Sequence, residues 1–167
     1  QRKGYSRRTI ARRLAAVRAF FSFLFKKGIV SENPARGVKT PKEGRRIPPF
    51  LREDEVVSLL EFPSGDTPLE LRDRAILETL YAAGLRVSEL VGLNLDSIDL
   101  DTGFVRAYGK GSKERIVPIG AKAEEALVKY LEDGRPGLVS KGRESRALFL
   151  NCNGTRLSQR AVQIMVN

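Results

Sequence analysis

Arg86 and Glu89 are the first pair of side chains whose types and spacing suit chemistry on a phosphate. Gly84 is placed to end one predicted helix, and Arg86 lies at the first turn of the next. A guanidinium at this position, beside outward-pointing backbone N–H groups, suits a phosphate. Glu89 follows three residues later, on the same helical face, and can hold the guanidinium in place. The alternative is an ordinary Arg–Glu pair on the surface.

A lysine at a predicted hairpin tip is the second candidate. Residues 108–115 have the sequence YGKGSKER and connect two predicted strands, so that a glycine flanks Lys110 on each side. The glycines allow a tight, exposed turn that presents the lysine on a long flexible stem. Such a tip can enter a groove or reach a leaving oxygen. The alternative is a lysine that only keeps a sheet edge soluble.

The composition excludes several other kinds of chemistry. The chain has no histidine and one cysteine, Cys152. A disulfide within the chain, a zinc site of the usual Cys/His kind and a histidine base within these 167 residues are therefore excluded. No apolar run approaches the ~20 residues of a membrane span, and no signal peptide opens the chain. We expect a cytoplasmic protein with no membrane partner.

Positive charge is concentrated at the start of the chain. Residues 1–49 hold 14 Lys and Arg against two acids, a net charge of +12, whereas residues 50–167 have a net charge of −2. This distribution indicates an anionic partner such as nucleic acid. The alternatives are a solvated basic face or a membrane surface. The membrane surface is disfavoured because the apolar stripe of the first helix is needed for a core.

The residue pattern in the first third of the chain predicts one long helix followed by a linker. Residues 6–27 form an amphipathic pattern with Arg8 and Arg12 opposite the apolar stripe, which consists of Ile10, Leu14, Val17, Phe21, Leu24 and Phe25. A turn is predicted at residues 33–36. Residues 39–49, rich in proline and positive charge, predict an extended basic linker.

The remaining chain predicts a mainly helical domain with a few short strands. Helices are expected at residues 52–61, 69–83, 86–91 and 121–132 and after Ser158. Strands are expected at 97–100, 104–108, 115–119 and 148–150, a polar loop at 134–146 and a turn at 151–155.

Two segments together resemble the tyrosine recombinases of the integrase family, and within it the Xer site-specific recombinases. They are residues 80–90, with the sequence LYAAGLRVSEL, and residues 109–118, with the sequence GKGSKERIVP. The resemblance spans nearly the whole chain. It implies the C-terminal part of a helical core-binding domain at 1–38, an interdomain linker at 39–49 and the N-terminal part of a catalytic domain at 50–167. The implied fold class is α+β, mainly helical with a small three-stranded antiparallel sheet.

The resemblance also implies roles for individual residues. In this family a tyrosine attacks a DNA phosphodiester and forms a 3′-phosphotyrosyl link, with no metal or cofactor. Arg86 resembles the first catalytic arginine, Lys110 the hairpin lysine that protonates the leaving oxygen, and Glu89 the supporting acid. We expect DNA contacts from Arg7, Arg8, Arg12, Arg13, Lys39, Lys42, Arg45, Arg46, Lys113 and Arg115.

The chain also departs from the family pattern. The block with a second arginine flanked by histidines is absent, and none of Tyr5, Tyr81, Tyr108 and Tyr130 has the sequence context of the nucleophile. We expect part of a longer recombinase that is inactive by itself. The implied partners are double-stranded DNA and other protomers in a tetramer on paired sites, as in chromosome dimer resolution. The alternatives are a non-catalytic DNA-binding protein and a degenerate or phage integrase.

Overall fold

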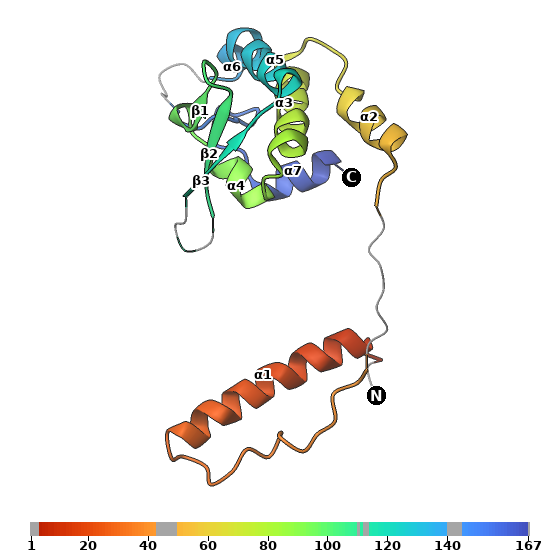
Figure 1. Cartoon of the computed structure of the whole chain (residues 1–167), viewed down its shortest axis with the longest axis vertical. Coiled ribbons are helices and arrows are strands. Elements are labelled where there is room, and N and C mark those ends of the chain that lie inside the picture. The colour runs from red at the N-terminus through yellow and green to blue at the C-terminus, as the bar shows by residue number, and fades with distance from the viewer. Residues whose placement is uncertain (1–3, 43–49, 110, 112–113, 140–144, 167) are drawn as a thin grey trace. The chain divides into compact units, whose positions relative to one another are not determined.

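The chain divides into two compact units, Gln1–Phe50 and Leu51–Asn167. The computed structural model describes residues 4–42, 50–109, 111, 114–139 and 145–166. Helix α1 (Arg7–Lys26) belongs to the first unit, and the sheet with the other described helices belongs to the second (Figure 1). Within the described residues, no helix is long and apolar enough to cross a membrane.

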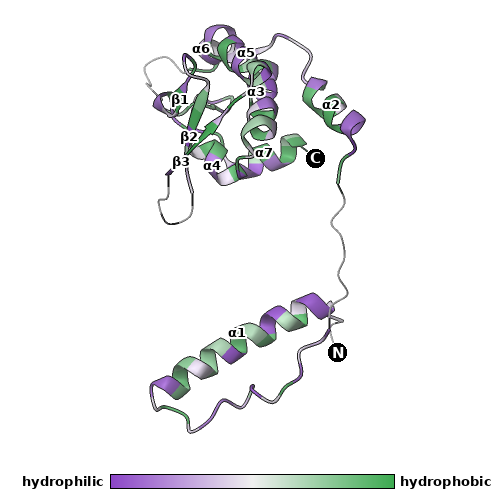
Figure 2. Ribbon diagram, in the orientation of Figure 1, coloured by the Kyte–Doolittle hydropathy of each residue, from purple (hydrophilic) through white to green (hydrophobic). Residues whose placement is uncertain are grey.

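Helix α1 begins and ends close to its predicted bounds because both ends carry local signals. The Ser6 hydroxyl accepts a hydrogen bond from the backbone N–H of Thr9 at 3.2 Å, which satisfies one of the free donors of the first turn. Gly28, with φ of 70°, occupies the left-handed region just after the helix. Four of the basic residues of α1 lie in its first turns, Arg18 lies near its middle and Lys26 in its last turn, with hydrophobic residues between them (Figure 2).

The segment after α1 folds back along the helix. The Arg18 side chain donates to the carbonyl oxygen of Ala35 at 3.1 Å and to the hydroxyl of Thr40 at 2.9 Å. The Asn33 amide donates to the carbonyl oxygen of Arg18 at 3.1 Å. The predicted turn at 33–36 is present, closed by a hydrogen bond from the backbone N–H of Arg36 to the Asn33 carbonyl at 3.1 Å.

The apolar stripe of α1 does not form the core that the sequence suggested. No residue of α1 is buried, and within the stripe Phe25 remains more than half exposed while Ile10 and Val17 are also exposed. The physical reason is that the described part of this unit contains one helix and a return segment, which together offer too little surface to cover the stripe.

The second unit begins with four helices and continues into the sheet. These helices are α2 (Glu53–Glu61), α3 (Pro68–Ala83), α4 (Val87–Gly92) and the short η1 (Leu95–Ser97). Helix α3 starts with a capping box, because Thr67 accepts from the backbone N–H of Glu70 while Glu70 accepts from that of Thr67. Gly84, with φ of 55°, ends α3 in the left-handed region and allows the chain to turn into α4.

The sheet has three antiparallel strands in the order β1 (Ile98–Asp99), β2 (Phe104–Tyr108) and β3 (Glu114–Pro118). Burial alternates along β2, as expected for a strand with one buried face, so that Val105 and Ala107 are buried between exposed neighbours. The pairing of Tyr108 with Glu114 sets the base of the hairpin, and Lys110 falls between these two residues in the sequence. The predicted small antiparallel sheet is confirmed.

The chain after the sheet is more helical than predicted. Helix α5 (Ala121–Lys129) continues through η2 (Tyr130–Gly134), a π-helical turn, into α6 (Arg135–Leu138). The prediction of a loop from 134 was therefore wrong at its start. Gly134 packs closely on α3, where a Cβ atom would lie 3.0 Å from that of Leu71, and Pro136 lies in the first turn of α6, where it needs no hydrogen bond.

The predicted strand at 148–150 was also wrong. The segment makes only isolated bridges, between Asn94 and Ala147 and between Leu150 and Arg156. Leu148, Phe149 and Leu150 are buried all the same. The chain then ends in α7 (Gln159–Val166).

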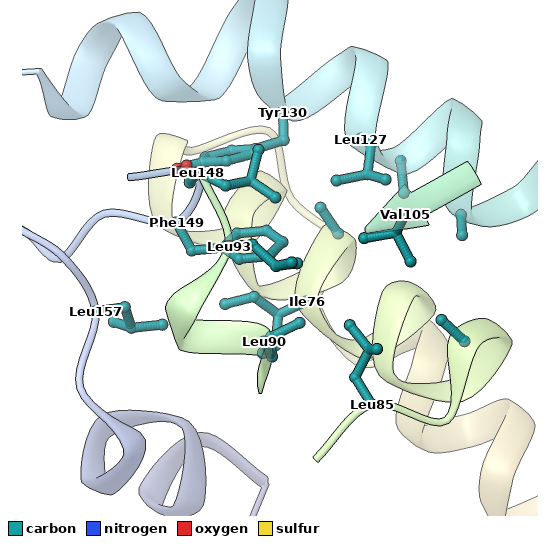
Figure 3. Close-up of a cluster of buried hydrophobic side chains, with 14 of the residues drawn as sticks. Ile76, Leu85, Leu90, Leu93, Val105, Leu127, Tyr130, Leu148, Phe149 and Leu157 are labelled. Atoms are coloured by element: carbon teal, nitrogen blue, oxygen red, sulfur yellow. Dashed lines mark hydrogen bonds between the residues drawn. The ribbon is translucent and has the colours of Figure 1, made fainter. Parts of the chain in front are cut away.

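The core of the second unit lies where the sheet, α3, α4 and α5 meet (Figure 3). Tyr130 and Phe149 stack with ring centroids 5.6 Å apart. The Tyr130 hydroxyl donates to the carbonyl oxygen of Leu148 at 3.1 Å, so this phenol is satisfied inside the core. Leu90 of α4 is fully buried in the same cluster. The core therefore anchors α4, which carries Glu89.

Candidate active site

Arg86 and Glu89 lie together at the start of α4, as the sequence predicted. Arg86 is the residue immediately before the helix, in an extended conformation with φ of −70° and ψ of 150°. One of its guanidinium nitrogens donates to Glu89 Oε1 at 2.7 Å. The Arg86 side chain is 72% exposed, whereas that of Glu89 is only 2% exposed. A buried carboxylate thus holds a guanidinium that faces solvent.

Glu89 also accepts hydrogen bonds from two further donors. Its Oε2 atom accepts from the backbone N–H of Arg86 at 2.9 Å and from the Arg115 guanidinium at 2.6 Å. Arg115 lies on β3, 26 residues further along the chain. The carboxylate therefore joins the start of α4 to a strand of the hairpin.

These donors hold the pKa of Glu89 well below its ordinary value of 4.5, at about 2. The hydrogen bond from the Arg86 backbone N–H contributes most, and burial acts in the opposite direction. The side chains of Arg115 and Arg86 lower the pKa further. Glu89 is therefore ionised at neutral pH, and it fixes the position of permanent cations.

Arg156 holds the other end of α4. Its guanidinium donates to the carbonyl oxygens of Val91 at 2.7 Å and Leu93 at 2.9 Å, which lie at the carboxyl end of the helix. A cation at this end also interacts favourably with the helix dipole. The sequence gives no signal for this contact, since no local pattern links residues more than sixty positions apart.

Two of the predicted hairpin residues lie outside the described residues, namely Lys110 and Lys113. The flanking strands β2 and β3 are described, and Gly111 has a φ of 79°, which a glycine adopts without strain. The roles of these two lysines therefore remain predictions. Arg115 pairs with Glu89, a pairing for which the sequence showed no signal, and its predicted contact with DNA stays a prediction.

The residues of the first unit that are predicted to contact DNA are exposed wherever the structure describes them. Arg7, Arg8, Arg12 and Arg13 lie on α1, and Lys39 and Lys42 follow it. The Arg13 guanidinium lies 4.0 Å from the ring centroid of Tyr5. Arg45 and Arg46 lie outside the described residues.

The four tyrosines occupy different environments. Tyr130 is buried, and burial raises the pKa of its hydroxyl above 10 despite the opposing hydrogen bond with the Leu150 backbone. It is thereby disfavoured as a nucleophile. Tyr5, Tyr81 and Tyr108 are exposed.

Replacing Glu89 with glutamine should lower the free energy of unfolding by about 1–3 kcal/mol near neutral pH. The folded-state pKa lies below the ordinary one, so the carboxylate stabilises the fold above about pH 4.5, and this stabilisation is lost as the pH falls toward about 2. The difference between variant and wild type should shrink over that interval. Urea unfolding at a series of pH values measures it.

Glu114→Gln is the matched control, because Glu114 forms an exposed ion pair with Arg106 at 3.1 Å on the same hairpin. Its effect should stay below about 1 kcal/mol. A Glu89→Gln difference that does not change with pH would contradict the assignment of an ionised, paired carboxylate.

Comparison with known proteins places this chain in a family. The profile described as "Phage integrase family" matches residues 49–167, and that described as "Phage integrase, N-terminal SAM-like domain" matches residues 1–28. The tyrosine recombinase XerC of Pelotomaculum thermopropionicum is 48% identical over 166 residues, which cover 98% of this chain and 54% of that protein. The tyrosine recombinase XerD of Oceanobacillus iheyensis is 45% identical over 157 residues, covering 94% and 52%.

Solved structures share the fold. The XerA recombinase superposes with a TM-score of 0.61 at 25% identity, over 90% of this chain and 57% of that one. The Tn1549 transposon integrase, in complex with transposon right end DNA, gives a TM-score of 0.73 at 20% identity, over 95% and 56%. The chain spans about half the length of the curated relatives it matches. The chain belongs to the phage integrase family, and the relatives with which it shares nearly half its residues are tyrosine recombinases.

Proposed function

We propose that this chain is the part of an Xer-type site-specific recombinase that binds DNA and holds the phosphate to be cleaved. The observation that carries the proposal is the Arg86–Glu89 pair, an exposed guanidinium fixed at 2.7 Å by a buried carboxylate. The similarity to XerC and XerD supports it over the full length of the chain. A cytoplasmic location stays a prediction.

The chemistry requires a cation at the phosphate. When a tyrosine oxygen attacks a phosphodiester, a bond forms to phosphorus and the bond to the 5′ oxygen breaks. Additional negative charge develops on the phosphate oxygens in the transition state, and a guanidinium that is already in position stabilises it without reorganisation. Arg86 would supply these donors, since its side chain is largely exposed while its orientation is set by Glu89.

The leaving 5′ oxygen needs a proton because its conjugate acid is weak. We assign this role to Lys110, at the tip of the hairpin between β2 and β3. The nucleophilic tyrosine is assigned to none of the four tyrosines of this chain and would come from another segment of the complete recombinase. The later attack of a 5′ hydroxyl on the phosphotyrosyl bond would release the tyrosine and exchange the strands.

The basic residues of the first unit would bind the DNA backbone. Four exposed arginines, Arg7, Arg8, Arg12 and Arg13, lie within two turns of α1, and Lys39 and Lys42 follow it. Contacts of this kind are electrostatic and carry little sequence information. The remaining partners would be further protomers, which together with this one form a tetramer on paired DNA sites.

Trapping of covalent complexes tests the function. A nicked suicide substrate, which loses the cleaved strand and cannot be resealed, should form a covalent adduct with the complete recombinase that contains this chain. The 167-residue chain alone should form none. Denaturing electrophoresis of labelled DNA shows the adduct.

Two results would contradict this assignment. An adduct with the chain alone would identify one of its four tyrosines as a nucleophile. If the complete protein binds the substrate and yields no adduct, the non-catalytic DNA-binding alternative holds.

A further inference from the structure

Glu89 receives guanidinium groups from two elements, and the second of these has no role in the function proposed above. We propose that Arg115 is a positioning residue: by binding Glu89 from β3, it fixes the base of the β2–β3 hairpin against the start of α4. The hairpin and Arg86 would then be held in one arrangement. The catalytic consequence rests on the proposed function, whereas the structural link does not.

The contacts of Arg115 join three elements. One terminal nitrogen of its guanidinium donates to Glu89 Oε2 at 2.6 Å and to the carbonyl oxygen of Gly84 at 3.2 Å. Gly84 ends α3, Glu89 belongs to α4, and Arg115 belongs to β3. One nitrogen thus ties the strand to the turn between two helices, immediately beside Arg86.

The position of Arg115 along β3 makes this link relevant to the hairpin. Arg115 pairs with Ala107 across the sheet. The next pair, Tyr108 with Glu114, is the last one before the loop. Ala107 is fully buried, so this rung of the ladder is anchored in the core. A restraint at this rung fixes the described base of the hairpin relative to α4.

The charges explain why two guanidinium groups are useful. The charged side chains that face Glu89 are Arg86, at the start of its own helix, and Arg115, from β3. When Arg86 directs its exposed donors at a phosphate, it shares its charge between that phosphate and Glu89, and a buried carboxylate with too little compensating charge would be costly. Arg115 adds a second cation that keeps Glu89 paired and ionised in that state. Arg86 can therefore stay on Glu89 Oε1 and bind phosphate, while its backbone N–H and Arg115 hold Glu89 Oε2.

A contact of Arg115 with DNA is the competing interpretation. The Arg115 side chain is 41% exposed, so part of it is accessible to a phosphate. This interpretation predicts an effect on DNA affinity alone. A positioning role predicts a change at Glu89 in the absence of DNA and a change in the cleavage rate of bound DNA.

The first test measures Glu89 in the chain itself, without DNA. Carboxyl NMR titration should show that Arg115→Gln raises the apparent pKa of Glu89 by one unit or more, since a cation at this distance lowers a carboxyl pKa by about 1–3 units. Arg115→Lys should restore part of the shift. Arg106→Gln, which removes an exposed hairpin arginine paired with Glu114, is the control and should leave Glu89 unchanged.

The second test uses the complete recombinase on a suicide substrate. Arg115→Gln should reduce the single-turnover cleavage rate of bound DNA about tenfold to 100-fold, because small misplacements of catalytic groups have effects of this size. The dissociation constant for DNA should change less than threefold. Arg106→Gln should leave the cleavage rate unchanged.

Different outcomes of these tests distinguish failure of the positioning role from failure of the proposed function. An unchanged Glu89 pKa, with weaker DNA binding and a shallower salt dependence, would overturn the positioning role in favour of a phosphate contact. If Arg115→Gln does not fold, the comparison of Arg115→Lys with wild type decides, and an identical pKa and cleavage rate would overturn the proposal. A shifted Glu89 pKa in a recombinase whose wild type does not cleave would refute the proposed function and leave the structural link standing.

Discussion

Replacing Arg86 with alanine in the complete recombinase should slow DNA cleavage about 10²–10³-fold, the typical effect of removing one preorganised donor from a developing anion. The guanidinium is 72% exposed and held by Glu89, so its donors face outward without rearrangement. DNA affinity should change little, because the exposed arginines of α1 and the basic residues that follow remain in place. Single-turnover cleavage and a separate binding titration measure the two effects.

Arg74→Ala is the matched control for this prediction. Arg74 is an exposed arginine on the neighbouring helix α3, so its removal takes away the same charge without touching Glu89. Its cleavage rate should stay close to that of the wild type. A loss of DNA affinity in Arg86→Ala, with an unchanged cleavage rate at saturating DNA, would reassign Arg86 to DNA positioning.

The largest contrast between two neighbouring residues is expected at Lys110 and Lys113. If Lys110 is the general acid, Lys110→Ala should reduce cleavage about 10²–10⁴-fold on a normal phosphodiester. A substrate with sulfur in place of the bridging 5′ oxygen has a leaving group of much lower pKa and needs little protonation. Cleavage by Lys110→Ala should therefore be largely restored on this substrate. Parallel single-turnover assays on the oxygen and sulfur substrates measure the rescue.

Lys113→Ala provides the comparison on the same hairpin. Lys113 directly precedes Glu114, the first residue of β3, in the sequence, and we expect it to bind a neighbouring phosphate. Its removal should cause a mild defect that sulfur does not correct. Rescue of both variants to the same extent, or of neither, would leave Lys110 as a contact in the DNA groove.

Several features were predictable because their signals lie within a few residues of one another. The Ser6 hydroxyl, which accepts from the backbone N–H of Thr9, marks the start of α1, and Gly28 marks its end. Gly84 ends α3. Burial alternates along β2 because successive side chains of a strand point to opposite faces, which places Val105 and Ala107 together on the buried face. The pairing of Arg86 with Glu89 was predictable for the same reason, since residues three apart on a helix are neighbours.

Local signals also account for the two elements that the sequence predicted wrongly. Gly134 and Pro136 are typical of a loop, but the packing of Gly134 against Leu71 and the first-turn position of Pro136 keep the chain helical through α6. The apolar run at 148–150 predicted a strand because burial and strand formation share a pattern. In the structure the segment enters the core with isolated bridges only.

The amino-acid sequence by itself determined most of the helices and the three-stranded sheet and placed Arg86 beside Glu89, because caps, turns and helical spacing depend on residues a few positions apart. Only the tertiary structure decided that Arg115 reaches Glu89 from β3 and that Arg156 holds the carboxyl end of α4. These contacts span 26 and 65 residues and exist only once the core has packed α3, α4 and the sheet together. The physical reason is that a hydrogen bond between distant residues depends on the packing of every element between them, and no short stretch of sequence contains that information.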